Sequence, residues 1–246
     1  MSKLNLISLF WQSLKKSWLD LLLIIFFIFC LLLAFLLIAF FTYIALLYYG
    51  VVSFNIIFTY RLIWTIVTYL VTFIIAVIAQ LLIINSLLKP RKKFIENLNS
   101  IKKYFWQFLI LTIIINILFV IFNIPIYVSI FFFALDNLIL GIISLIFGLI
   151  ITILLTSYLI FSPFLLIDKN TSWFESIKKS FSLTEKKLFQ VIFNVIILAL
   201  IILILNTISV LVLQLDIIGL VLSTIIFIIM VFTAFIYLFA MYQKFK

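Results

Sequence analysis

Long apolar stretches alternate with short polar segments along the whole of this 246-residue chain. Stretches of about 18 or more apolar residues with few or no charges are the pattern of transmembrane helices. Six such stretches occur, and none carries a formal charge at its middle. We therefore expect six membrane spans, joined by short connections into three hairpins. The stretches are 21–49, 62–88, a third that ends at Ala134, 138–167, about 187–213, and 217–242.

One short basic segment recurs before each expected hairpin. The best copy is WFESIKKSF at 173–181, the N-terminal copy is FWQSLKKSW at 10–18, and a weaker copy is SIKKYF at 100–105. Hydrophobic residues around the N-terminal copy recur at intervals of three and four, which predicts a helix with one apolar face. Such a basic helix lies in the headgroup layer, with aromatic side chains toward lipid and lysines toward water. The apolar face comprises Leu4, Ile7, Trp11, Leu14 and Trp18.

The recurrence also predicts the organisation of the chain. Three copies at equivalent places indicate an internal triplication, with repeats 1–88, 89–167 and 168–246 in a single integral membrane domain, 1–246. The expected fold class is all-α. It is a polytopic bundle of six transmembrane helices, in three hairpins each preceded by a basic amphipathic interfacial helix.

A proline and a group of small residues predict local features of two spans. Pro125, after Asn123, should interrupt span three, because proline cannot continue the helical hydrogen bonds. Small residues recur on one stripe of span four and should let a neighbouring helix approach closely. They are Gly141, Ser144, Gly148 and Thr152.

Two capping boxes predict where helices begin. The first, Ser172-x-x-Glu175, should begin the third basic helix. The second, Ser182-x-x-Glu185, is suited to begin span five.

Positive charge is distributed unequally between the two sides that six spans define. The net charge is +10, and 16 of the 17 Lys and Arg residues fall before span one, after spans two and four, or after span six. Only Arg61 falls on the other side. Because cytoplasmic connections carry an excess of Lys and Arg, both termini are expected in the cytoplasm, in a multi-pass protein of the cell membrane. Nucleic acid is then not an expected partner.

Residues that usually carry catalysis or bind metals are scarce. The chain has no histidine, its single cysteine, Cys30, lies in an apolar stretch, and no phosphate-binding, nucleophile-elbow or metal motif occurs. We expect no catalytic residue, cofactor or metal. The amides within the spans either make interhelical hydrogen bonds, which we favour, or line a polar path. The candidates for such a path are Asn116, Asn123, Pro125 and Asn194.

The stretch PFLLID at 163–168, followed by Ser172-x-x-Glu175-Ser176 and a lysine pair, resembles the cytosolic signature of a loose group of six-span prokaryotic proteins. That group includes the membrane domain attached to some glycerophosphodiester phosphodiesterases and several families of unknown function. The resemblance implies the six-span architecture, and it implies no catalytic residues because this chain contains no phosphodiesterase domain. Ser176 stands where the group usually has a small alanine.

Three hypotheses for function follow. We favour a non-catalytic membrane protein whose basic segments engage anionic lipid or an unknown membrane-protein partner, as an assembly or homeostasis factor. The alternative is a permease-like transporter of a lipidic or apolar solute, supported mainly by the break at Asn123 and Pro125. An enzyme that uses carboxylates of the inner connections is disfavoured. The residues expected to bind lipid or partner are Lys15, Lys16, Lys102, Lys103, Trp173, Lys178 and Lys179.

Overall fold

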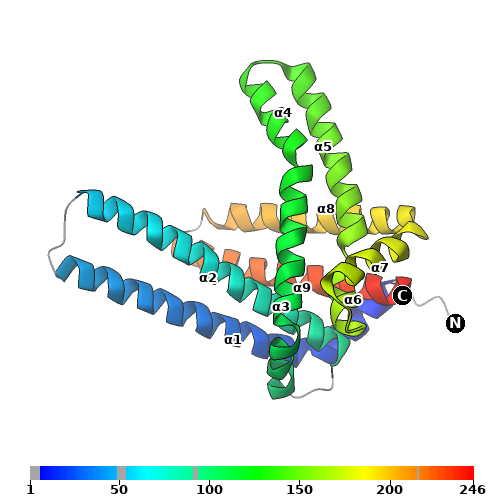
Figure 1. Ribbon diagram of the computed structural model, residues 1–246, viewed down its shortest axis with the longest axis horizontal. Coiled ribbons are helices and arrows are strands. Elements are labelled where there is room, and N and C mark those ends of the chain that lie inside the picture. Colours follow the sequence, from blue (N-terminus) through cyan, green and yellow to red (C-terminus); the bar gives the residue numbers. More distant parts are fainter. Residues whose placement is uncertain (1–5, 49–53, 91–93, 215) are drawn as a thin grey trace. The chain divides into compact units, whose positions relative to one another are not determined.

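The computed structural model of the chain describes residues 6–48, 54–90, 94–214 and 216–246 (Figure 1). Over these residues the chain is helical and contains no strand, which confirms the all-α fold class. The helices are α1 Leu6–Tyr48, α2 Phe54–Leu88, α3 Phe94–Phe122, α4 Ile124–Ala134, α5 Leu138–Leu159, α6 Ser162–Asp168, α7 Trp173–Glu185, α8 Leu188–Val212 and α9 Asp216–Phe245.

Among the described residues, five helical stretches are long and apolar enough to cross a membrane, so the chain is a helical membrane protein. The first expected span falls in α1 and stays a prediction. Leu4, Tyr49 and the side chain of Arg61 lie outside the described residues. The five stretches are Ile63–Leu88, Ile95–Ala134, Leu138–Asp168, Leu188–Val212 and Val221–Phe245.

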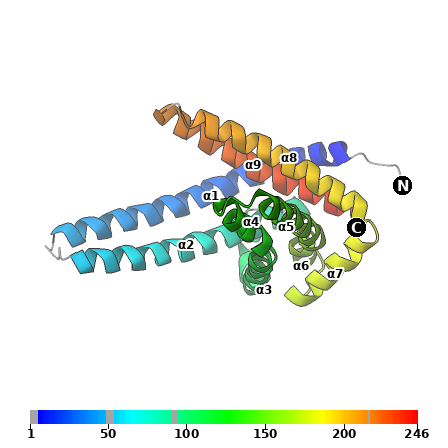
Figure 2. The same ribbon diagram turned by 90° about the horizontal axis from the view of Figure 1, so that it is seen from above.

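Ser17–Leu109 forms one of two compact units of the chain. Within it, α1 and α2 lie side by side in both views (Figures 1 and 2). Buried amides link α2 to α3, since Asn85 Nδ2 donates a hydrogen bond to Asn97 Oδ1 at 2.6 Å. Ser86 Oγ donates to Asp20 Oδ2 of α1 at 3.4 Å. Polar contacts therefore connect three helices of this unit.

The other unit comprises Met1–Lys16 and Ile110–Lys246, and within it α4 packs along α5 and α8 along α9. The α4 and α5 backbones approach closely at two glycines. A Cβ added to Gly148 would lie 2.5 Å from Cγ1 of Ile126 and 3.0 Å from its backbone nitrogen, and a Cβ on Gly141 would meet an aromatic ring of α4 at 2.5 Å. The predicted close approach along the small-residue stripe of span four is thus confirmed at its glycines.

The predicted interruption of span three is also confirmed. The helix ends with α3 at Phe122, and α4 begins at Ile124 with Pro125 in its first turn. Asn123 lies between them with φ −88° and ψ 0°, outside the ordinary helical geometry. Proline therefore separates two helical segments here, where its missing amide hydrogen costs no internal hydrogen bond.

Candidate functional site

The three recurring basic segments, 10–18, 100–105 and 173–181, share one pattern of exposure. All six lysines of their lysine pairs are exposed. The residue after each pair is buried, with exposed fractions of 1% for Ser17, 7% for Tyr104 and 0% for Ser180. Each segment therefore presents two ammonium groups outward and holds the next side chain inside the protein. The lysines are Lys15, Lys16, Lys102, Lys103, Lys178 and Lys179.

The segments differ in the helices that contain them. The N-terminal segment lies inside α1, which continues from Leu6 to Tyr48, and the segment at 100–105 lies inside α3. These two segments are therefore not separate helices, and their expected interfacial position stays a prediction. The physical reason is that neither helix contains a Gly or Pro that would end it.

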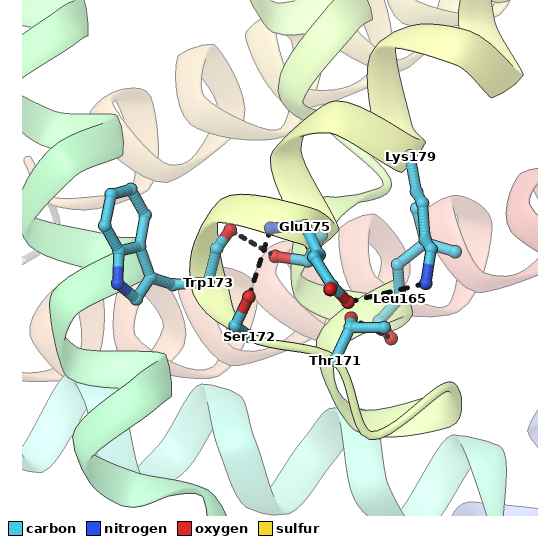
Figure 3. Close-up of polar contacts among 7 residues, drawn as sticks. Leu165, Thr171, Ser172, Trp173, Glu175 and Lys179 are labelled. Carbon is cyan, nitrogen blue, oxygen red and sulfur yellow. Dashed lines mark hydrogen bonds and ion pairs between the residues drawn. The ribbon is translucent and has the colours of Figure 1, made fainter.

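Among the described residues, only the third segment belongs to a short helix of its own, α7. Before it, Asn170 adopts a left-handed conformation with φ 52°. The chain therefore leaves the helical geometry between α6 and α7. Ser172 Oγ then accepts a hydrogen bond from the backbone N–H of Glu175 at 3.3 Å, which confirms the predicted cap (Figure 3). One turn further on, the Glu175 carboxylate lies 3.7 Å from Nζ of Lys179 (Figure 3).

Hydroxyl side chains dock α7 onto the end of α5. Ser180 Oγ donates to the backbone oxygen of Tyr158 at 2.6 Å, and Thr184 Oγ1 donates to that of Ser157 at 3.0 Å. These carbonyls lie in the last turn of α5, where backbone oxygens have no N–H partner within the helix. Ser176, one turn earlier on α7, is also completely buried. We call Ser176, Ser180 and Thr184 the docking face.

The docking face explains why the second predicted capping box is wrong. Ser182 and Glu185 belong to the last turns of α7, and α8 begins only at Leu188 without a side-chain cap. The helix continues through these residues because Thr184, between them, is fixed to α5. Tertiary contact therefore overrides the local capping signal.

Outside the docking face, α7 carries aromatic and basic side chains, of which Phe181 also stacks on Tyr158 of α5 with ring centroids 4.7 Å apart. Phe174 is 62% and Phe181 40% exposed, and Lys178 and Lys179 are exposed with them. The indole of Trp173, half-buried, points away from Glu175 and Lys179 in Figure 3. The sequence analysis identified these lysines and aromatics but missed the docking face. The pattern that could have indicated this face is the spacing of four residues between its hydroxyl side chains.

The amides inside the spans mostly connect neighbouring helices. Asn123 Oδ1 accepts a hydrogen bond from Thr152 Oγ1 of α5 at 2.7 Å, and Asn194 Oδ1 accepts one from the Tyr237 hydroxyl of α9 at 3.0 Å. The favoured interpretation of interhelical hydrogen bonds is confirmed for these two residues. Asn116 differs, because its Nδ2 donates to a backbone oxygen one turn earlier in α3.

Asp168, at the end of α6, anchors the end of α9. Its Oδ2 accepts a hydrogen bond from the Tyr242 hydroxyl at 2.7 Å and forms an ion pair with Lys246. The ring of Tyr242 is 1% exposed and stacks on Phe164, with centroids 5.5 Å apart. The partner Lys246 comes from the far end of the chain.

No family model, curated protein or solved structure matches this chain. The resemblance to the phosphodiesterase-associated membrane domain accordingly stays a prediction. Over the described residues, no three His, Cys, Asp or Glu side chains are grouped closely enough to hold a metal ion. The candidate sites are therefore the three basic segments, each taken by itself, with two exposed lysines in each.

Proposed function

We propose that this chain is a six-span protein of the cell membrane, with three helical hairpins and both termini in the cytoplasm. Five apolar helical stretches and the continuous apolar helix α1 support the number of spans. The distribution of 16 of the 17 Lys and Arg residues on one side supports the orientation. In this arrangement all three basic segments lie at the cytoplasmic face.

The function proposed for these segments is to hold anionic lipid headgroups, in a non-catalytic assembly or homeostasis factor. The observation that carries the proposal is the outward position of all six lysines, next to exposed aromatic side chains. The nearby aromatics Trp11, Trp106 and Phe174 are 55%, 70% and 62% exposed. Aromatic rings lie at headgroup depth, and lysines there are attracted to an anionic leaflet by ~1 kcal/mol each.

The alternative, a permease-like transporter of a lipidic or apolar solute, draws on the helix break at Asn123. A broken helix in a transporter offers free polar groups to its substrate. Here the Asn123 amide donates to the backbone oxygen of Phe119 at 2.7 Å and accepts from Thr152 at 2.7 Å. These contacts favour a structural role for the break, so we place the transporter second.

The test replaces all six lysines of the pairs by glutamine and counts retained phosphatidylglycerol by native mass spectrometry. We expect the glutamine variant to lose most of the anionic lipid that the parent protein retains. The matched control replaces the same lysines by arginine, which keeps the charge. Labelling of an Asn137→Cys variant from outside the cell checks that the orientation is unchanged. Retention equal to that of the parent would show that these lysines only orient the protein.

A further inference from the structure

A second group of cations forms where α8 begins and α9 ends. Nζ of Lys187 lies 5.3 Å from the centroid of the Phe245 ring, and Nζ of Lys244 lies 5.7 Å from the same centroid. Phe245 itself is 5% exposed, so its ring is fixed within the protein. The fold thus brings together two ammonium groups from distant parts of the chain, around one buried ring.

A third cation beside them is already neutralised. Lys246 is paired with Asp168, and its Nζ lies 5.6 Å from the centroid of the Tyr242 ring. Within the part of the chain that the structure describes, Lys187 and Lys244 form no ion pair with a carboxylate. Each ammonium has three N–H donors. The face of an aromatic ring attracts the positive charge but does not provide oxygen acceptors for these donors. The two lysines are therefore suited to an anion with several oxygen acceptors.

We propose that Lys187 and Lys244 together bind the phosphate of one anionic membrane lipid. The inference rests on the proposed function in that it places these residues at the lipid surface, but it uses none of the six paired lysines. A phosphate group bridges the two ammonium groups with charge-assisted hydrogen bonds. Asp168 keeps Lys246 in place and limits the positive charge of the group.

The surroundings favour a lipid over free phosphate. Lys187 immediately precedes the apolar stretch Leu188–Val212, and Lys244 lies at the end of Val221–Phe245. Phe189, in the first turn of α8, is 87% exposed, and Phe193 on the next turn is 64% exposed. Aromatic side chains at this end of a span lie against the upper acyl chains of a lipid. A lipid phosphate held at the two lysines would lie at the ends of two apolar helical stretches, along which its acyl chains can extend.

The experiment uses the full chain in a neutral detergent and titrates phosphatidylglycerol, with binding followed by native mass spectrometry. The K187Q/K244Q variant is compared with the parent and with a matched control, K169Q/K186Q, which removes two exposed lysines of the neighbouring connections. We expect K187Q/K244Q to bind its tightest lipid about thirtyfold more weakly, the loss expected for two basic residues at an anionic surface. The control is expected to change binding less than about threefold, since isolated exposed charges contribute little.

Two further comparisons decide between explanations. The K187R/K244R variant keeps both charges and should retain parental binding, which separates a lost charge from a lost fold. Excess inorganic phosphate should leave the lipid bound. Equal losses in K187Q/K244Q and K169Q/K186Q would overturn the proposal, and so would displacement of the lipid by inorganic phosphate.

The result is also distinguishable from failure of the proposed function. A variant with all six paired lysines replaced by glutamine should still retain one tightly bound phosphatidylglycerol at Lys187 and Lys244. If that variant loses lipid while K187Q/K244Q matches the parent, only the present inference is wrong. If the six-lysine variant retains all of its lipid while K187Q/K244Q loses one molecule, the proposed function is wrong and the inference stands.

Discussion

The N-terminal basic segment and the segment in α7 have the same residue pattern but belong to helices of very different kinds. Each pattern runs aromatic, polar, Ser, aliphatic, Lys, Lys, Ser, aromatic. Both serines are buried in both segments, with exposed fractions of 7% and 1% for Ser13 and Ser17 and of 0% for Ser176 and Ser180. Yet α1 has 43 residues and α7 only 13. The shared pattern therefore determines which face is buried, and it does not determine where the helix ends.

The difference shows that the two segments are held in different ways. In α1 the segment is part of a helix that continues after it, so backbone hydrogen bonds on both sides help to keep its lysines in place. The helix α7 has no such continuation, and it depends on Ser180 and Thr184, which donate to carbonyls of α5. Short helices are marginal without tertiary contacts. In α1 we therefore expect the largest destabilisation from substitutions that break backbone hydrogen bonds. In α7 we expect it from substitutions on the docking face.

The largest effect is expected from a proline that separates the N-terminal segment from the rest of α1. Leu19→Pro removes the amide donor to the carbonyl of Lys15 and clashes with that group, which should lower the free energy of unfolding by about 3 kcal/mol or more. Leu19 is 64% exposed, so Leu19→Ala is a control that keeps the backbone donor and loses little packing. Unfolding in mixed micelles measures both variants. Equal stability of the two would mean that α1 is not continuous at this point.

A somewhat smaller loss is expected from a bulky residue on the docking face of α7. Ser180→Leu overfills a closed contact at a cost of about 1–3 kcal/mol, and also removes the hydrogen bond to Tyr158. Hydrogen exchange should accelerate throughout α7 in this variant. The control Ser182→Leu places the same side chain on the exposed side of the helix. Comparable exchange in the two variants would argue against docking through Ser180.

The corresponding change in α1 sharpens the comparison. Ser17→Leu should destabilise the protein because Ser17 is 1% exposed. Amides of α1 around the substitution should nevertheless stay protected from exchange, since the helix continues on both sides. If Ser17→Leu accelerates exchange in α1 as much as Ser180→Leu does in α7, both segments depend on their buried serines.

The smallest effect is expected from one hydroxyl. Thr184→Val keeps the shape of the side chain but removes its hydrogen bond to the Ser157 carbonyl, at a cost of about 1 kcal/mol. Thr184→Ser keeps the hydroxyl, so the hydrogen-exchange rates of the α7 amides in this variant should stay closer to those of the parent protein. Hydrogen exchange of α7 compares the two. If the serine variant is the more weakened, the methyl group contributes more than the hydrogen bond.

Features that depend on neighbouring residues could be predicted from the sequence. The all-α class and the apolar stretches follow from composition over windows of helix length. The interruption at Pro125 follows because proline has no amide hydrogen. The close approach at Gly148 follows because glycine has no side chain. The cap at Ser172 is equally local, because its hydroxyl bonds to a backbone group three residues away.

Features that depend on distant residues could not be predicted. The pairing of Asp168 with Tyr242 and Lys246 joins groups more than seventy residues apart, and nothing near Asp168 indicates it. The docking face was missed because buried serines and lysine-rich surfaces have the same helical period. A periodic pattern identifies two faces of a helix, and only the tertiary contact shows which one packs on protein.

The central proposal is that α7 lies at the membrane surface with Phe174 toward lipid and Lys179 toward water. Power-saturation EPR tests it directly, with a spin label at Phe174→Cys or at Lys179→Cys, which lie on different sides of the helix, in a Cys30→Ser background and in vesicles containing phosphatidylglycerol. We predict that the label at 174 is reached by oxygen at headgroup depth, while the label at 179 is reached by a water-soluble nickel chelate. Equal access of the nickel chelate to both labels, with no oxygen preference at 174, would contradict the account.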